Sequence, residues 1–329
     1  MKKILFALSV LVLGLFTSCS NDEIPMDKQM TFKINPQTVI SAFTNYRGDL
    51  EELKGASLRI RLFIYSENGA LVAQSEKELT TYLQLANISL SVPEGKYRAV
   101  AISDVLPAGS GNACWSLSGE KNISTLTLTD VGNDGKNNNL LGVATEQFTA
   151  GSSQQNVDLS LKPVGAVFNI HFANIHSLND VAAYQLLANK INDAIVFDAQ
   201  GNINSSIKME NGDNYRLARF NPSDYSSEPS VDVLSYVFPM SNLMVYFEGE
   251  TSDGDGQMLG KALVINDIKV GQEYRISIDL SKAGSGFDVK WQLLNSGSNA
   301  PLQESDPVAA NCAPQSSNSI QVSKLIKDL

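Results

Sequence analysis

The chain has 329 residues, of which 43% are hydrophobic and 18% charged, and this is enough apolar material for one large core or two ordinary ones. Its formal net charge is -10, and its 25 basic residues are spread along the chain. They do not make the Lys/Arg-rich face that nucleic-acid binding requires, so we expect no nucleic-acid partner. No motif in the chain calls for a cofactor, and we expect none.

The chain begins with the features of an export signal. Lys2 and Lys3 precede an apolar run from Ile4 to Phe16, and the small residues Thr17 and Ser18 follow it. This order is that of a signal peptide, which we place at residues 1–18. The apolar run is too short for the roughly 20 residues of a membrane-spanning helix.

Cys19 directly follows the small residues, and Phe16-Thr17-Ser18-Cys19 resembles the lipobox of bacterial lipoproteins. The resemblance implies that cleavage leaves Cys19 as a new N-terminus that carries acyl chains, palmitate among them. Several chains at about 0.8 kcal/mol per buried methylene would anchor the protein stably in the outer membrane. The alternative is an ordinary signal peptide with an incidental cysteine.

Residues 19–29 have no helical or strand period and are expected to form a tether. The polar run Ser20-Asn21-Asp22-Glu23 resembles the surface-export signal of lipoproteins from Gram-negative anaerobes. That resemblance implies exposure at the cell surface. A plain solvated linker is the alternative, and these residues leave the choice open.

Residues 30–158 show the two-residue period of β-strands. Met30, Phe32 and Ile34 alternate with polar residues, and the stretch from Leu58 to Ile64 alternates in the same way. Asn68-Gly69 then predicts a tight hairpin. A Pro93-Glu94-Gly95 turn precedes another strand from Lys96 to Ile102. The pattern predicts an N-terminal β-sandwich.

Residues 159–292 repeat these sequence patterns, which predicts a C-terminal β-sandwich. The stretch Val196–Ile203 echoes Ile64–Leu71, and Gly271–Ile278 echoes Gly95–Ile102. The echoes keep their order but not their spacing, so we expect two domains of common architecture with a long insertion in the second copy. Chance is the alternative, because Gly-x-Tyr strands are common in β-sandwiches. Residues 293–329 are polar and form a predicted tail.

The residue types that carry chemistry are sparse. The two histidines, His171 and His176, fall on opposite faces of a continuous strand and have no ligand-spaced partner, so we expect packing or surface roles. The carboxylate-rich turns at 253–256 and 130–135 invite a calcium site, but neither fits an EF-hand loop and hairpin turns explain both. We therefore predict a protein that is not an enzyme, with no catalytic residues and no metal.

The cysteines and aromatic residues leave two questions open. Cys114 and Cys312 are too few for a disulfide framework, and the sequence does not decide whether they pair. Five aromatic residues would form a sugar-stacking platform if they were exposed together, whereas burial in a β core is the default. These residues are Trp115, Trp291, Tyr46, Tyr65 and Tyr82.

Three features together resemble the fimbrillin-like surface lipoproteins of Gram-negative anaerobes. These are the lipobox, the stretch Ile60–Tyr65 with its Gly-turn, and the Pro93–Arg98 hairpin, followed by a second domain that enters through Leu161–Val167 and closes with Tyr274–Leu280. The resemblance covers nearly the whole mature chain. It implies an all-β fold of two tandem transthyretin-like Greek-key β-sandwich domains.

In that family, shaft subunits polymerise by strand donation after an N-terminal strand is cleaved off behind a basic residue. The resemblance implies that Met30, Phe32 and Ile34 belong to the removable strand and that Arg47 is the cleavage point. Ile320, Val322 and Ile326 would belong to a donated or docking segment. The alternatives are an ordinary edge strand and a frayed tail. Anchor-type relatives keep their lipid and are not cleaved.

We therefore expect a cell-surface structural or adhesive lipoprotein, in the form of a fimbrial anchor, tip or minor subunit. The expected partners are the outer-membrane lipid through Cys19, other fimbrial subunits, and a host or glycan ligand. The alternative is a non-catalytic glycan-binding lipoprotein of a nutrient-uptake system.

Overall fold

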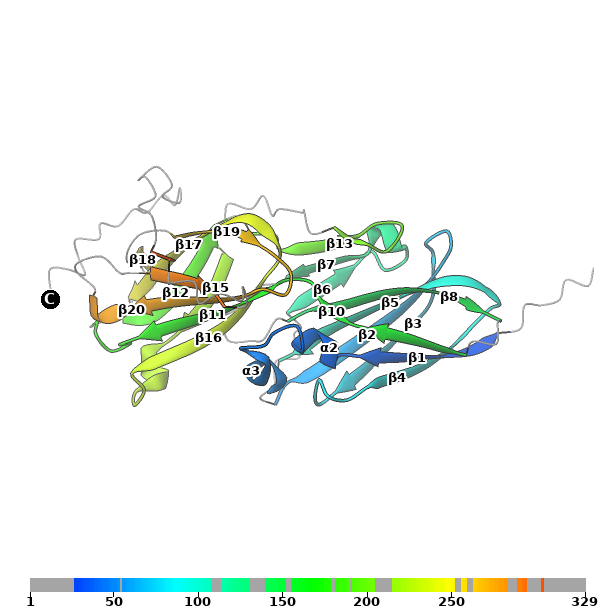
Figure 1. Ribbon diagram of the computed structural model, residues 1–329, viewed down its shortest axis with the longest axis horizontal. Helices are drawn as coiled ribbons and strands as arrows, with labels where there is room; N and C mark the ends of the chain where they lie inside the picture. The colour runs from blue at the N-terminus through cyan, green and yellow to red at the C-terminus, as the bar shows by residue number, and fades with distance from the viewer. Residues whose placement is uncertain are drawn as a thin grey trace, which may run out of the picture.

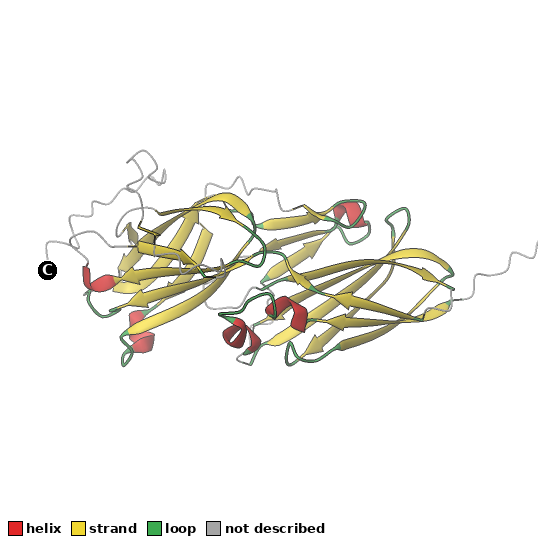
Figure 2. Cartoon of the chain, in the orientation of Figure 1, coloured by secondary structure: helices red, strands yellow, loops and turns green. Residues whose placement is uncertain are grey.

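β-strands make up most of the described chain (Figure 2). The computed structural model describes residues 27–53, 55–107, 114–130, 140–151, 155–178, 181–189, 191–204, 215–251, 256–258, 263–282, 289–294 and 303–304. Within these residues the helices are short: α2 (Gln37–Ile40), α3 (Arg47–Glu51) and the 3-10 turns η1 (Ile123–Thr125), η2 (Pro222–Tyr225) and η3 (Leu280–Lys282). None of them has the length and apolar character of a bilayer-spanning helix. The predicted all-β class is confirmed.

The first sandwich is built from two sheets (Figure 1). The smaller sheet has the order β4-β1-β9, with β4 (Ala86–Val92), β1 (Lys28–Asn35) and β9 (Asn156–Ser160). The larger sheet has the order β10-β8-β5-β2-β3, with β10 (Lys162–Pro163), β8 (Gly142–Ala150), β5 (Gly95–Leu106), β2 (Ser57–Ser66) and β3 (Leu71–Leu79).

The hairpin between β2 and β3 follows from local sequence. Alternate residues of β2, from Leu58 to Ile64, are fully buried, as the two-residue period of a pleated strand requires. The turn closes through backbone bonds in which Ser66 donates to Ala70 and Gly69 donates to Ser66. Gly69 has a φ of 82°, a left-handed conformation that glycine adopts without a Cβ clash. The predicted hairpin is confirmed.

The second sandwich also has two sheets. One has the order β16-β11-β20-β21-β22, with β16 (Ser230–Val237), β11 (Ala166–Ala173), β20 (Glu273–Asp279), β21 (Val289–Leu293) and β22 (Gln303–Glu304). The other has the order β15-β12-β17-β18, and β19 also pairs with β17. Its strands are β15 (Tyr215–Phe220), β12 (Val181–Asn189), β17 (Met240–Thr251), β18 (Gly256–Met258) and β19 (Leu263–Ile268).

The two sandwiches share one pairing plan. In each, the opening strand, β1 or β11, lies between an antiparallel neighbour, β4 or β16, and a parallel neighbour, β9 or β20. In each, the next strand, β2 or β12, pairs on one side with β3 or β15 and on the other with β5 or β17. The expectation of common architecture is therefore correct at the level of topology.

The sequence echoes, however, do not mark equivalent strands. Gly95–Ile102 lies in β5, at the centre of the larger sheet, whereas the echoing stretch Gly271–Ile278 leads into β20, which pairs with the opening strand β11. The predicted correspondence between these stretches is wrong. The Gly-x-Tyr pattern indicates a turn that leads into a strand. Such turns occur in every sheet of a sandwich, so the pattern does not identify equivalent strands.

A third layer joins the two halves. The order β14-β13-β7-β6 combines β6 (Trp115–Ser118) and β7 (Thr127–Asp130), inserted between β5 and β8, with β13 (Ala194–Phe197) and β14 (Ile203–Asn204), inserted between β12 and β15. We call this four-stranded sheet the bridging sheet. The second echo, Val196–Ile203, forms its β13–β14 hairpin, where Gly201 has a φ of 78°. This hairpin reproduces the β2–β3 turn in a different place.

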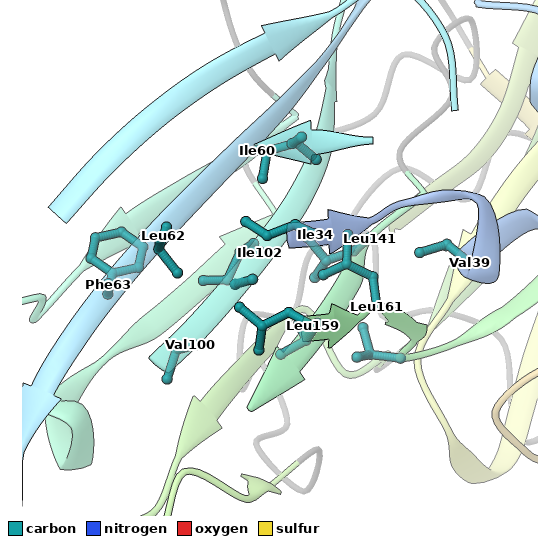
Figure 3. Packing of buried hydrophobic residues seen from close by; sticks show 14 of the residues in the cluster. Ile34, Val39, Ile60, Leu62, Phe63, Val100, Ile102, Leu141, Leu159 and Leu161 are labelled. Atoms are coloured by element: carbon teal, nitrogen blue, oxygen red, sulfur yellow. The ribbon is translucent and has the colours of Figure 1, made fainter. Parts of the chain in front are cut away.

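The buried hydrophobic residues form two clusters, one centred in each sandwich, and the first also takes in Val167 and Tyr236 of the second sandwich. Figure 3 shows part of the first cluster, where Ile34 of β1 packs with Leu141, Leu159 and other aliphatic residues. The first cluster also takes in Ile195 and Phe197 of the bridging sheet. The limits given above for the domains stay a prediction, and β9 crosses the one near residue 158 because it pairs with β1 as far as Ser160.

Candidate functional site

The predicted removable strand, β1, lies in the middle of its sheet. It pairs antiparallel with β4 from Lys28 to Ile34 and parallel with β9 from Thr31 to Asn35. The alternative of an ordinary edge strand is therefore wrong. Because β1 has a neighbour on both sides, its departure would leave a slot between β4 and β9 with two rows of unpaired backbone groups.

The three predicted residues of β1 all point into the core of the first sandwich. Met30 is 1% exposed, and Phe32 and Ile34 are fully buried. The Phe32 ring meets the edge of Phe148 on β8, with centroids 5.3 Å apart. Burying such side chains stabilises the fold by about 1.5–3 kcal/mol each. The geometry brings these residues together as one row of anchors.

The chain that follows β1 leads from the core to the surface. Val39, Ile40 and Phe43 are fully buried around α2 and hold this segment against the first sandwich. Arg47 is the first residue of α3 and is exposed. The predicted cleavage point is thus accessible at its side chain, although a helical turn has to open before a protease can bind it in extended form.

A buried carboxylate holds the residues just before Arg47. Glu273, the first residue of β20, is fully buried. Its Oε1 accepts hydrogen bonds from the backbone N–H groups of Asn45 at 2.7 Å and Tyr46 at 3.1 Å, and its Oε2 accepts one from Asn45 Nδ2 at 2.8 Å. We call these contacts the latch. They tie the segment after β1 to the second sandwich through charge-assisted hydrogen bonds.

The side chain of Tyr46 packs next to the latch, in the first cluster of buried hydrophobic residues. The residue is 7% exposed, and burial is the main reason why its pKa is raised to about 12. The phenol therefore stays neutral in the folded state at physiological pH. The sequence offers no sign of the latch, because Glu273 follows a turn and resembles any charged residue at the edge of a strand.

A second buried ionic group lies between the larger sheet of the first sandwich and the bridging sheet. Asp104 is fully buried on β5. It accepts two hydrogen bonds from the Arg59 guanidinium, at 3.0 and 2.6 Å, and Arg61 Nη2 lies 3.3 Å from it. Burial lowers the pKa of Arg61. The polar face expected for β2 is thus covered, because the insertions place the bridging sheet over it.

Tyr236 of β16 connects the linker between the sandwiches to the second of them. Its buried hydroxyl accepts hydrogen bonds from the backbone N–H groups of Val164 and Gly165 and donates one to the carbonyl of Leu141 at 3.1 Å. Phe238 packs beside it and against Trp115, with ring centroids 5.1 Å apart in the latter pair. Sequence reasoning missed both residues, since nothing in their local pattern distinguishes them from core residues.

The aromatic residues considered for sugar stacking are buried wherever the structure describes their side chains. Trp115 is 3% exposed, and Tyr46, Tyr65 and Tyr82 are also buried. The Trp291 side chain lies outside the described residues. The expectation that these aromatics belong to the core is confirmed for the four.

The histidines make ordinary hydrogen bonds. His171 Nδ1 lies 3.2 Å from Asp232 Oδ1 on the neighbouring strand β16, and His176 Nε2 lies 3.1 Å from the carbonyl oxygens of both Tyr225 and Glu228. In the described part of the chain, His, Cys, Asp and Glu residues form no group of three that could hold a metal ion.

Several predicted site residues lie outside the described residues. These are Cys19 with the signal peptide, the segment with Ile320, Val322 and Ile326, and most of both carboxylate-rich turns. Cys312 lies there too, so its pairing with Cys114 stays open. Cys114 itself is buried, and burial raises the pKa of its thiol to about 12.

Comparison with known proteins adds information on the fold. No protein-family model matches the chain, and no curated protein matches it. A solved structure from Bacteroides thetaiotaomicron, described as a candidate polysaccharide-binding protein, superposes with a TM-score of 0.52 at 13% identity, covering 85% of this chain and 98% of the other.

Two further solved structures superpose less closely. A candidate adhesin from Bacteroides ovatus has a TM-score of 0.49 at 8% identity, covering 84% of this chain and 95% of the other. The tip fimbrial protein Mfa3 from Porphyromonas gingivalis has a TM-score of 0.41 at 10% identity, covering 81% and 99%. At these identities the Bacteroides thetaiotaomicron structure shows a shared fold and nothing of function. The β-sandwich architecture expected from the fimbrillin-like resemblance is therefore confirmed as a fold.

Proposed function

We propose that the protein is a cell-surface structural or adhesive lipoprotein, a fimbrial anchor, tip or minor subunit, that assembles by β-strand addition. Cys19 would hold it in the outer membrane. The observation that carries the proposal is the position of β1, a central strand with Met30, Phe32 and Ile34 buried in one row. Such a slot suits an extended segment of another subunit, because ladder hydrogen bonds supply affinity and alternate side chains fix register.

The surroundings of Arg47 support the same proposal. An exposed arginine follows the buried segment directly, so one cut there would detach β1 and α2 from the rest of the chain. The latch to Glu273 would then add hydrogen bonds to the non-covalent contacts that hold the cut segment. In this scheme an uncut chain acts as an anchor or tip, and a cut chain accepts a strand. Ile320, Val322 and Ile326 remain the proposed donor residues.

The names of the similar structures agree with a surface role but differ on what is bound. They include adhesins and a tip fimbrial protein on one side and a candidate polysaccharide-binding protein on the other. Glycan capture in a nutrient-uptake system is therefore the second candidate function. The burial of Trp115, Tyr46, Tyr65 and Tyr82 disfavours a stacking platform in the described residues.

The proposal is tested with the native lipoprotein expressed in a Gram-negative anaerobic host. Surface digestion of whole cells, followed by an unboiled SDS gel, should give a ladder of SDS-resistant oligomers that appears only after proteolysis. An Arg47→Ala variant should remove the ladder. Lys121→Ala, at an exposed turn residue away from β1, is the matched control and should keep it. A monomer throughout, retarded in gels that contain polysaccharide, would favour the glycan-binding alternative.

A further inference from the structure

A groove of about 610 Å³ lies where the two sandwiches and the bridging sheet meet. β8 forms one wall from Val143 to Glu146, and β9 forms the other from Asp158 to Ser160. The β13–β14 hairpin, Pro239 and Val270 close its ends from the bridging sheet and the second sandwich. We call it the junction groove. It is separate from the position of β1, which lies on the far side of β9.

Both walls of the junction groove are sheet edges. Among the described residues, β9 has β1 as its only strand neighbour. β8 pairs with β5 along its length, but on its other side it pairs only with the two residues of β10, at Gly142 and Val143. From Ala144 to Phe148 its outer edge has no neighbouring strand in the described chain. Such edges are templates for the addition of a further strand.

Two of the residues that line the junction groove are exposed aliphatics, set among polar lining residues. Ile203 is 37% exposed and Val270 is 50% exposed, and both line it. Large aliphatic side chains are exposed to this extent at only a few other described positions, Val72, Leu83 and Leu85. Open sheet edges with both exposed aliphatic and polar side chains beside them suit an added strand that carries apolar and polar side chains in alternation.

The C-terminal end of the chain has the sequence that such a surface would bind. Ile320 and Val322 alternate with Ser319, Gln321 and Ser323 in the two-residue period of a strand, and Leu325 and Ile326 follow Lys324. Lys324 and Lys327 lie in the same stretch and would complement Glu146 and Asp158, which outnumber Lys162 among the charged residues of the groove lining. We infer that residues 319–327 of the same chain dock in the junction groove as an added strand.

The end of the described chain lies within reach of the groove. Glu304 of β22 is opposite Lys290, and Lys290 is opposite Ser277 of β20. Val270 lies seven residues before Ser277, in the turn that leads into β20, so the separation along the strand direction is at most roughly 23 Å at about 3.3 Å per residue. Residues 305–318 can extend to about 45 Å. The spacer is therefore long enough to cross the second sandwich and enter the groove.

Tethering favours the chain's own segment over that of a second copy. A flexible linker of this length sets an effective concentration on the order of 1 mM, far above the concentration of a second molecule in dilute solution. Docking would keep the proposed donor residues bound to their own chain until a strand is exchanged with another subunit. Only this consequence rests on the proposed function. The docking itself requires no cleavage at Arg47.

Hydrogen exchange of the full-length lipoprotein in detergent tests the inference, with a variant truncated after Asp306 for comparison. We expect the backbone amides of residues 144–148 and 157–160 to exchange about tenfold faster or more after truncation. The amides of β3, an edge strand far from the groove, should not change. Paired Ile320→Asp and Val322→Asp substitutions should reproduce the truncation, whereas Ser316→Asp and Ser317→Asp in the spacer should not.

A variant of the groove makes the test independent of the tail. Val270→Asp should release the same amides, and Leu83→Asp, at an equally exposed aliphatic residue elsewhere, should not. Equal exchange in the full-length and truncated chains would overturn the inference. Protection that rises with protein concentration, together with an oligomer that truncation dissolves, would assign the groove to a second copy and overturn the intramolecular docking. Neither readout depends on proteolysis, so failure of the proposed function leaves the result interpretable.

Discussion

The opening strands of the two sandwiches occupy the same place in the pairing plan but are held differently. β1 buries one face, since Met30, Phe32 and Ile34 alternate with half-buried or exposed residues. β11 is buried on both faces from Ala166 to Ile170, and its neighbouring residues Ala166 and Val167 belong to different core clusters. A strand anchored on one face can leave as a unit, whereas β11 is part of both cores. If an opening strand is exchanged as proposed, this difference favours the first sandwich.

The largest expected effect comes from removing an anchor of β1. Phe32→Ala should lower the free energy of unfolding by about 3–5 kcal/mol, as should Phe168→Ala in β11, because both leave a cavity in a packed core. Chemical denaturation measures this. The two variants should differ in proteolysis: Phe32→Ala alone should speed trypsin cleavage after Arg47 more than it speeds cleavage elsewhere. Equal acceleration at all sites in both variants would remove the distinction between the strands.

The two sandwiches also differ in how far an ion pair in each is buried. Asp104→Asn in the first sandwich should cost about 3–5 kcal/mol, because it leaves the buried charges of Arg59 and Arg61 uncompensated. Asp232→Asn in the second should cost at most about 1 kcal/mol, since the Asp232 side chain beside His171 is 50% exposed. Urea unfolding of both variants measures the difference. A similar loss in both would mean that the bridging sheet does not shield the Asp104 group from water.

The latch should control access to Arg47. Asn45→Ala removes a side-chain hydrogen bond to Glu273, worth about 1.5 kcal/mol, and should therefore raise the rate of limited trypsin cleavage after Arg47 by roughly tenfold. Thr44→Ala, at the neighbouring exposed residue, is the matched control and should leave the rate unchanged. If both variants are cleaved at the wild-type rate, the opening of α3 rather than the latch limits access.

The smallest expected effect is a loss of stability at alkaline pH. Burial is the main cause that raises the pKa of Tyr46 and of Tyr274 to about 12. The folded state thus keeps protons that the unfolded state releases, so this stability is complete below about pH 10 and is lost as the pH rises towards 12. Thermal melting between pH 9 and 11 should show a shallower decline for Tyr46→Phe. An unchanged slope would mean that other tyrosines dominate.

Local patterns in the sequence predict strands and turns correctly in this protein, but they do not predict which distant segments pair with one another. The alternation around Met30 and Leu58 and the turn at Asn68-Gly69 predict β1, β2 and their hairpin correctly, because a pleated strand and a left-handed turn depend on adjacent residues. The bridging sheet could not be predicted, since its halves come from insertions in different sandwiches. For the same reason Asp104 and Glu273 look like surface charges in the sequence, although other elements bury them.

The same distinction between local patterns and long-range pairing applies to the candidate site. The sequence and its fimbrillin-like resemblance indicate β1 and Arg47, and the structure places them in succession, from the core to the surface. The latch and the junction groove involve residues more than a hundred positions apart, such as Asn45 with Glu273, and no spacing rule connects them. Charged residues that directly follow a turn deserve to be considered as partners of distant backbone N–H groups.

Strand complementation tests the central claim, that β1 is an exchangeable strand, most directly. The lipoprotein is cut after Arg47 with trypsin, the released segment is removed under mild denaturation, and a synthetic peptide of residues 27–36 is added. We predict that the peptide restores the melting transition of the first sandwich and that a peptide with Phe32→Asp does not. Recovery of the full transition without any peptide, or equal recovery with both peptides, would contradict the account.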